Sequence, residues 1–278
     1  MSKIKKPLVS IIITTKNAAS HTPYFTEVLR SIKNQSYKNI ELIVSDNFST
    51  DDTVKIAKSF RATVFFKGPE RAAQMNYAAR KAKGKYIAVT GDDMLFDKNY
   101  IKKAVEVCEN GFDCVYHSTI VPDGNFLVKV RGLERLSYVG DDSIECAWFW
   151  KKTAFLGVGG YNSSLVAGED FDLQERLDEA GYKTGRTNIA NSHLGEPTSL
   201  KEIIRKNYYY GTSILNYLGE NPSFRAKKMF PIRKAFFKNW LLFLKHPILS
   251  LGLIFYKSVQ YFAAILGMIH SQLSGKDN

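Results

Sequence analysis

Residues 8–17 read LVSIIITTKN, residues 40–47 read IELIVSDN and residues 86–93 read YIAVTGDD. Each stretch opens on an apolar run, over residues 8–13, 40–44 and 86–89, as is typical of a parallel strand buried on both faces of a sheet. Each then changes to polar or acidic residues. Because the carboxyl ends of parallel strands meet at one edge of a sheet, where such folds bind ligands, these polar ends predict one site.

The segments between these strands predict helices. Apolar residues recur at helical spacing between positions 25 and 32. A helix over 51–60 is expected to begin at Ser49 or Thr50, because either hydroxyl can act as an N-cap. The remaining elements are a strand over 62–66 and a helix from Pro69 to about residue 83. This β-α-β-α-β-α-β order predicts an α/β fold with a mostly parallel, Rossmann-like central sheet flanked by helices.

The pattern beyond residue 98 is less regular. It predicts a helix over 100–109, a strand over 113–117, a loop-rich segment over 118–143 and a helix over 169–180 that Gly181 ends. No linker separates these parts, so residues 1–198 are interpreted as one domain. Residues 199–278 are interpreted as a helical appendage.

The charge of the chain is concentrated in that appendage. Of the net charge of +12, +9 lies from Ser199 onward, together with many aromatic and leucine residues. Basic residues beside apolar helices favour an anionic membrane surface over nucleic acid, since no nucleic-acid motif is present. Residues 248–269 would reach about 33 Å as a helix, enough to span a bilayer. Lys257 and Gln260 interrupt this stretch and Pro247 precedes it, which favours helices lying at the membrane interface. Packing on residues 1–198 or a dimer contact is the alternative.

Cysteine usage and the N-terminus predict a cytoplasmic protein. Cys108, Cys114 and Cys146 are three in number and form no CxxC pair, which argues against a zinc site and a disulfide framework. The apolar run over 8–13 is too short for a signal peptide.

Three further features carry possible chemistry. Gly91-Asp92-Asp93 follows a strand, and a carboxylate pair there can hold a divalent cation. Asp170, after Glu169 at a predicted helix start, can act as a general base, although both carboxylates could merely favour the helix dipole. His193 can bind a metal beside carboxylates, although a lone histidine is more often structural.

The order of these motifs resembles family 2 glycosyltransferases of the GT-A fold. The resemblance rests on VSIIITTKN (9–17), ELIVSDNFSTD (41–51), GKYIA (84–88) before Gly91-Asp92-Asp93, Gly159-Gly160-Tyr161 before Glu169-Asp170, and His193. It covers residues 8–198 and implies that residues 1–198 form the catalytic domain. Resembling sequences with such tails act on lipid-linked glycans. With the cytoplasmic location predicted above, this places the protein at the cytoplasmic face of the membrane.

The resemblance also implies roles for individual residues. It places Thr14, Asn17, Asp46 and Asn47 around the nucleotide base and ribose, and Arg71 and Asn76 on a donor-side helix. It makes Asp93 and His193 ligands of Mn²⁺ or Mg²⁺ next to Asp92, Asp170 the base of an inverting transfer, and Glu169 an acceptor contact. The implied donor is a UDP- or GDP-linked sugar, and the implied acceptor is a polyprenyl- or dolichyl-linked glycan or polyprenyl phosphate.

Two departures from the family pattern keep alternatives open. Gly91 stands where the family has the first Asp of its DxD motif, so a catalytically silent sugar-nucleotide-binding module is one alternative. Lys16 replaces a common Tyr, which leaves the nucleotide base undecided. A polysaccharide-building enzyme with a soluble or protein-bound acceptor is the other alternative. A nucleotidyltransferase is disfavoured, because residues 14–17 lack the glycines of a phosphate loop.

Overall fold

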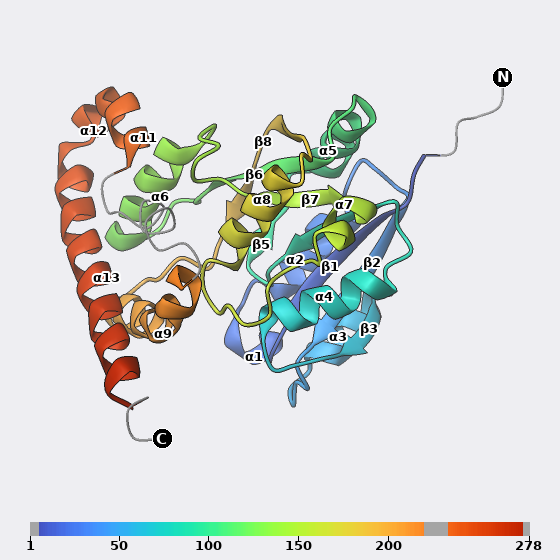
Figure 1. Cartoon of the computed structure of the whole chain (residues 1–278), viewed down its shortest axis with the longest axis horizontal. Coiled ribbons are helices and arrows are strands. Elements are labelled where there is room, and N and C mark those ends of the chain that lie inside the picture. The colour runs from blue at the N-terminus through green and yellow to red at the C-terminus, as the bar shows by residue number, and fades with distance from the viewer. Residues whose placement is uncertain (1–5, 220–232, 275–278) are drawn as a thin grey trace. The chain divides into compact units, whose positions relative to one another are not determined.

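The computed structural model describes residues 6–219 and 233–274 (Figure 1). In this part of the chain, eight strands form one sheet in the order β3-β2-β1-β4-β7-β6-β8-β5. The strands are β1 (Val9–Thr15), β2 (Ile40–Asp46), β3 (Thr63–Phe66), β4 (Tyr86–Thr90), β5 (Met94–Leu95), β6 (Cys114–Ile120), β7 (Ala147–Lys151) and β8 (Thr184–His193). The helices are α1 (Ala18–His21), α2 (Phe25–Lys33), α3 (Thr53–Ser59), α4 (Arg71–Lys81), α5 (Tyr100–Glu109), α6 (Phe126–Tyr138), α7 (Lys152–Gly157), α8 (Glu169–Glu179), α9 (Leu200–Leu218), α11 (Lys234–Lys238), α12 (Trp240–Lys245) and α13 (Pro247–Ser274).

The first half of the sheet is parallel, as the sequence predicts. β1 pairs in parallel with both β2 and β4, and β2 pairs in parallel with β3. β7 runs antiparallel to β4 and β6, and β5 runs antiparallel to β8, so the complete sheet is mixed. The α/β fold with a helical appendage is confirmed, and Gly181, at a φ of 78°, follows the end of α8.

Helices cover both faces of this sheet. Successive residues of β1 face opposite sides, because a strand has a period of two residues. Ile11 and Ile13 pack with residues of α2 and α5, whereas Ile12 packs with residues of α4 and α8. All three side chains are fully buried. Burial on both faces is why β1 reads as a continuous apolar run.

Two local predictions are wrong. Neither Ser49 nor Thr50 caps α3, which begins at Thr53. Both residues instead close the loop around the strand ends: the Ser49 hydroxyl donates to Asp46, and the Thr50 N–H donates to Asn17.

The segment 118–143, predicted to be loop-rich, contains the 13-residue helix α6. Asn125 caps it by accepting a hydrogen bond from the Val128 N–H at 3.1 Å. The buried positions of α6 are Val130, Leu133, Glu134 and Ser137. Their spacing is helical, but half of them are polar, which hides the amphipathic pattern in the sequence.

The chain divides into two compact units. The first comprises Met1–Ser118, Cys146–Ser163 and Asp170–Gly195 and holds most of the sheet. The second comprises Thr119–Glu145, Ser164–Glu169 and Glu196–Asn278. Its helices α6, α9 and α13 share a small core of Val130, Ile203, Leu253 and Tyr256.

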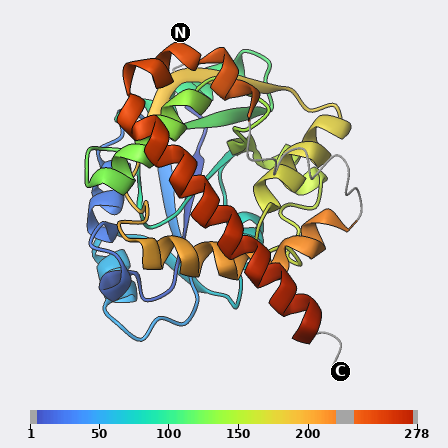
Figure 2. The ribbon, with the colours of Figure 1, turned by 90° about the vertical axis from the view of Figure 1, so that its left-hand side faces the viewer.

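Within the second unit, α13 crosses α9 at close range (Figure 2). A Cβ on Gly211 would lie 2.1 Å from the backbone oxygen of Ala264, and one on Gly267 would lie 2.1 Å from that of Tyr208. Only glycine therefore permits this approach. Among the described residues, α13 is the one helix long and apolar enough to cross a membrane, and 17% of its most apolar window is buried.

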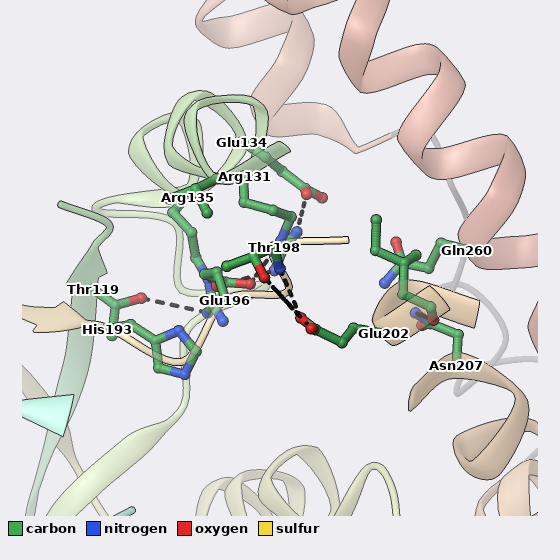
Figure 3. Close-up of polar contacts among 12 residues, drawn as sticks. Thr119, Arg131, Glu134, Arg135, His193, Glu196, Thr198, Glu202, Asn207 and Gln260 are labelled. Atoms are coloured by element: carbon green, nitrogen blue, oxygen red, sulfur yellow. Dashed lines mark hydrogen bonds and ion pairs between the residues drawn. The ribbon is translucent and has the colours of Figure 1, made fainter. Parts of the chain in front are cut away.

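The second unit also contains a buried network of charges (Figure 3). Glu134 of α6 forms ion pairs with Arg131 and with Lys257 of α13. Glu196 accepts from Arg131 Nε at 3.0 Å and from Arg135 Nε at 2.9 Å. Burial alone would raise the pKa of Glu134, but the charges of Arg131 and Lys257 lower it to about 2.

Candidate active site

An open pocket of about 540 Å³ lies in the first unit at the carboxyl end of β1. Its volume is in the range of small-molecule sites. Its lining residues come from β1, the loop and helix after it, α4 and the end of β4: Thr14, Thr15, Lys16, Asn17, Ser20, His21, Arg71, Gln74 and Asp92. Lys16 and Arg71 carry positive charge, so the pocket suits an anionic ligand beside one carboxylate.

Asn17 shapes the turn that leaves β1. Its backbone is left-handed, at a φ of 52°, and its N–H donates to the Ser49 hydroxyl at 2.7 Å. Its side-chain oxygen accepts from the Thr50 N–H at 2.9 Å. The loops after β1 and β2 are therefore tied together at the pocket edge.

Asp46 also connects the ends of β1 and β2, next to the pocket. This fully buried carboxylate accepts from the Thr15 hydroxyl at 2.8 Å and from the Ser49 N–H and hydroxyl at 2.7 and 2.6 Å. It holds the two strand ends together and does not line the pocket. Asn47 donates to the carbonyl of Pro69 at 2.7 Å and is likewise outside the lining.

Arg71 reaches the pocket from the first position of α4. Its guanidinium lies 5.4 Å from the ring centroid of Trp148, a cation–π contact. Trp148 in turn stacks on His117, with centroids 4.4 Å apart and an interplanar angle of 10°. Arg71 is thus supported by a stack that includes β6 and β7.

Two polar residues further along α4 point to different partners. Gln74 lines the pocket and donates to the carbonyls of Thr15 and Ser45, at 3.1 and 2.6 Å. Asn76 is buried, donating to the Tyr161 carbonyl at 2.7 Å and accepting from its N–H at 2.8 Å. A Cβ on Gly160, whose φ is 73°, would lie 2.5 Å from the Asn76 oxygen, so glycine is required there.

Asp93 and His193 meet at the edge of the sheet. His193 Nε2 lies 3.5 Å from Asp93 Oδ2. The pairing of β5 with β8 places Met94 opposite His193, and the Leu194 N–H donates to the Asp93 carbonyl at 2.8 Å. The carboxylate fits closely against Gly195, where an added Cβ would lie 1.9 Å from Asp93 Oδ2.

The ionised form of Asp92 is electrostatically disfavoured. Burial, and then the charge of Asp93, raises the pKa of Asp92 to about 6. A cation held between such groups would relieve that repulsion. Asp93 and His193 offer an oxygen and an imidazole nitrogen, a donor set that suits Mn²⁺.

The described residues contain no group of three His, Cys, Asp or Glu side chains placed to hold a metal on their own. A cation bound through one or two protein ligands normally completes its coordination with substrate phosphates and water. The donor set therefore fits a metal that binds together with a diphosphate.

Asp170 is the second residue of α8. Its Oδ1 atom is buried and has no hydrogen-bond partner among the described residues. A buried carboxylate oxygen without a partner costs free energy, and such an atom needs an explanation such as a catalytic role. Glu169 begins α8 and belongs to the second unit.

The structure thus brings some of the predicted site residues together. Four of them line the pocket, namely Thr14, Asn17, Arg71 and Asp92, and Asp93 pairs with His193. Sequence reasoning missed the contributions of Ser20, His21, Gln74 and Trp148. The position of Gln74 in α4, one turn after Arg71, was the one signal that could have indicated that it lines the pocket. Nothing in the sequence indicated that Trp148 supports Arg71.

Comparison with known proteins agrees with this arrangement. Residues 10–159 match the family described as Glycosyl transferase family 2. The chain is 31% identical over 199 residues to the putative glycosyltransferase EpsE of Bacillus subtilis, covering 64% of this chain and 69% of that protein. It is 27% identical over 220 residues to chondroitin synthase of Escherichia coli, covering 71% of this chain and 30% of that protein.

A solved structure has a similar fold. The mannosyltransferase PcManGT from Pyrobaculum calidifontis, in complex with GDP-Man and Mn²⁺, superposes with a TM-score of 0.65 at 16% identity, covering 97% of this chain and 88% of that one. The architecture of the chain is that of the GT-A fold. The chain belongs to glycosyl transferase family 2. It spans about a third of the length of several curated relatives that it matches.

Proposed function

We propose that this glycosyltransferase moves a sugar from a UDP- or GDP-linked donor to an acceptor hydroxyl or phosphate. One observation carries the proposal: a residue that lines the pocket is adjacent in the chain to a candidate metal ligand. Asp92 lines the basic pocket, and Asp93, next in sequence, pairs with His193 at 3.5 Å. A nucleotide diphosphate fits a site that offers the cations Lys16 and Arg71 together with a place for a divalent cation.

Metal dependence is part of this proposal. Asp93 and His193 would hold Mn²⁺ or Mg²⁺, with Asp92 beside them. A divalent cation supplies charge neutralisation of the leaving diphosphate. Arg71, held by Trp148, and Lys16 would bind and orient the phosphates. The relative PcManGT was solved with GDP-Man and Mn²⁺, which supports this assignment.

Asp170 is proposed as the general base. The acceptor oxygen forms a bond to the anomeric carbon as the bond from that carbon to the diphosphate oxygen breaks. Where the acceptor is a hydroxyl, its proton passes to Asp170. Attack opposite the leaving group inverts the anomeric configuration. The buried Oδ1 atom of Asp170 has no other described partner, which supports this role. Glu169 is proposed as an acceptor contact.

The acceptor is proposed to be a polyprenyl-linked glycan or polyprenyl phosphate at the cytoplasmic face of a membrane. Residues 1–198 would be the catalytic domain and residues 199–278 the membrane-interface region. Exposed large apolar side chains on α12 and α13 support the membrane-interface role. Examples are Leu244 at 65%, Ile248 at 73% and Leu251 at 69%. Lys245 is exposed among them, as a basic residue is in interfacial helices.

A second candidate is a polysaccharide-building enzyme whose acceptor is soluble. The similarity to chondroitin synthase favours it. Transfer of labelled sugar into a lipid-extractable product, against a water-soluble product, separates the two acceptors.

A thermal-shift screen of UDP- and GDP-sugars, with and without Mn²⁺, tests the donor and the metal. A donor that binds only the folded state raises the melting temperature. We expect one nucleotide to stabilise the chain, more strongly with Mn²⁺, and Asp93→Asn and His193→Gln to remove the Mn²⁺ increment. An Mn²⁺ increment as large in both variants as in the wild type would reject these residues as metal ligands.

A further inference from the structure

A buried histidine, His117 of β6, contacts two parts of the candidate donor site through different atoms. Its ring stacks on Trp148, with centroids 4.4 Å apart, and Trp148 in turn contacts the Arg71 guanidinium. Its Nδ1 atom lies 3.3 Å from Asn191 Nδ2 on β8. The ring therefore supports the cation of the pocket, and Nδ1 contacts the strand that ends at His193.

Asn191 connects β8 to the segment that follows β5. Its side-chain oxygen accepts a hydrogen bond from the Asp97 N–H at 2.9 Å, two residues after the end of β5. The pairing of β5 with β8, which sets Asp93 beside His193, includes only two residues of β5. The hydrogen bond of Asn191 extends this short pairing and helps to hold the two candidate metal ligands together.

His117 determines which way the Asn191 amide faces. The atom that faces the Asp97 N–H must be the amide oxygen, because two N–H groups cannot hydrogen-bond to each other. The amide NH₂ then faces His117 Nδ1, which must act as the acceptor and therefore carries no proton. The Tyr100 hydroxyl lies 3.4 Å from the same nitrogen and can also donate to it. The acceptor on His117 thus keeps Asn191 in the orientation that the Asp97 N–H requires.

We propose that His117 is a positioning residue that acts on both halves of the donor site. Its ring holds Arg71 through Trp148, and its Nδ1 atom holds the β5–β8 pairing through Asn191. The inference rests on the proposed function, since Arg71 must bind the diphosphate and the residues at that pairing must bind the metal. The two contacts are separable, because one needs an aromatic face and the other needs a hydrogen-bond acceptor.

Two substitutions separate these contacts. His117→Phe keeps an aromatic ring against Trp148 but has no acceptor for Asn191. His117→Asn places an amide oxygen near the position of Nδ1 but has no ring. The control, His246→Phe, makes the same change as the first variant at an exposed histidine. The melting temperature of each variant without ligand shows whether it folds.

Calorimetry with UDP and GDP, first in EDTA and then with Mn²⁺, measures both contacts without an acceptor. We expect His117→Phe to bind the nucleotide in EDTA as the wild type does, and to bind Mn²⁺ roughly tenfold more weakly in the nucleotide complex. We expect His117→Asn to bind the nucleotide about fivefold more weakly in EDTA and to keep the wild-type Mn²⁺ affinity. His246→Phe should match the wild type in both titrations. Equal loss of both affinities in the two His117 variants would overturn the proposal.

A double-mutant cycle tests the path through Asn191. Asn191→Leu removes the amide, leaves the stack on Trp148, and should weaken Mn²⁺ binding roughly tenfold. It therefore tests the metal contact even where His117→Phe does not fold. Because both residues are proposed to act through one hydrogen bond, the double variant should lose no more than either single variant. Losses that multiply in the double variant, or wild-type Mn²⁺ affinity in Asn191→Leu, would overturn the path.

The same titrations separate this inference from the proposed function. Nucleotide and Mn²⁺ binding that none of the variants at His117 and Asn191 changes would overturn the role of His117 and leave the glycosyltransferase site standing. Failure of the wild type to bind either nucleotide would overturn the proposed donor site, and the role of His117 with it.

Discussion

His193 Nε2 lies 3.5 Å from Asp93 Oδ2, although one hundred residues separate them in the sequence. The antiparallel pairing of β5 and β8 produces this contact, because it sets Met94 opposite His193. The candidate metal ligands are therefore positioned by backbone hydrogen bonds. Their geometry depends on the short strand β5 as much as on the side chains themselves.

Gly195→Ala should disable the site without changing a proposed ligand. The added Cβ would lie 1.9 Å from Asp93 Oδ2, so the carboxylate must leave its present position, 3.5 Å from His193 Nε2. We expect transfer to fall roughly a hundredfold, the upper range for displaced metal-site geometry. Initial rates across Mn²⁺ concentrations measure this effect. Gly132→Ala is the control, since its nearest atom would be 3.7 Å away; an equal loss in that variant would refute the explanation.

Asp170→Asn should abolish transfer while leaving donor binding intact. The amide keeps the shape of the carboxylate but cannot accept a proton, and general base catalysis contributes roughly a hundredfold to ten-thousandfold. Single-turnover transfer to a hydroxyl acceptor and thermal shift with the donor measure the two quantities. Glu179→Gln makes the same chemical change at the exposed end of α8 and should retain full activity. Wild-type rates in Asp170→Asn would remove this residue from the mechanism.

Trp148→Ala should raise KM for the donor about fivefold, because an exposed or half-buried cation–π contact contributes about 1 kcal/mol. The indole lies 5.4 Å from the Arg71 guanidinium and holds it toward the pocket. Trp148→Phe keeps an aromatic face and should restore most of the donor affinity. A loss of kcat with unchanged KM in the Ala variant would instead indicate a role away from the donor.

Glu134 should make the stability of the chain fall at acid pH. Its pKa is lowered from 4.5 to about 2 in the folded chain, so the unfolded chain takes up the proton first as the pH falls. The stabilisation of about 3 kcal/mol is complete above pH 4.5 and is lost between about pH 4.5 and pH 2.

Urea unfolding of wild type and Glu134→Gln across this range measures the effect. The difference in unfolding free energy between the two should be largest near neutral pH and shrink as the pH falls to 2. A difference that stays constant with pH would contradict the coupling of Glu134 to Arg131 and Lys257.

Continuous apolar runs were enough to predict the parallel half of the sheet. The runs 8–13, 40–44 and 86–89 are buried on both faces, so hydrophobicity alone reports their structure. The antiparallel half of the sheet was harder to predict from the sequence. The strand β5 has two residues, too few for any period, and it is recognisable only by its pairing with β8.

The candidate site was predictable where it lies on strand ends and not where it depends on tertiary contacts. Thr14, Asn17 and Asp92 follow predicted strands, and they line the pocket. Asp46 also follows a strand, but its oxygens are occupied by Thr15 and Ser49 beneath the pocket, which no sequence pattern reveals. The roles proposed for Asp170 and Glu169 remain predictions.

The glycine crossing of α9 and α13 limits what the C-terminal helix can do. If α13 left its unit to act as a lone transmembrane anchor, Gly267 would lose its close contact with the Tyr208 backbone of α9. Glu134 would lose its ion pair with Lys257. Glu134 would keep its ion pair with Arg131, but the Lys257 ammonium would enter the bilayer without its carboxylate, at a cost of about 2.5–3.5 kcal/mol for a charge near the centre of the helix. Any bilayer attachment is then made by a helix that keeps its place beside α9. Alkaline carbonate should wash such a protein from membranes, as it does a peripheral protein, without detergent.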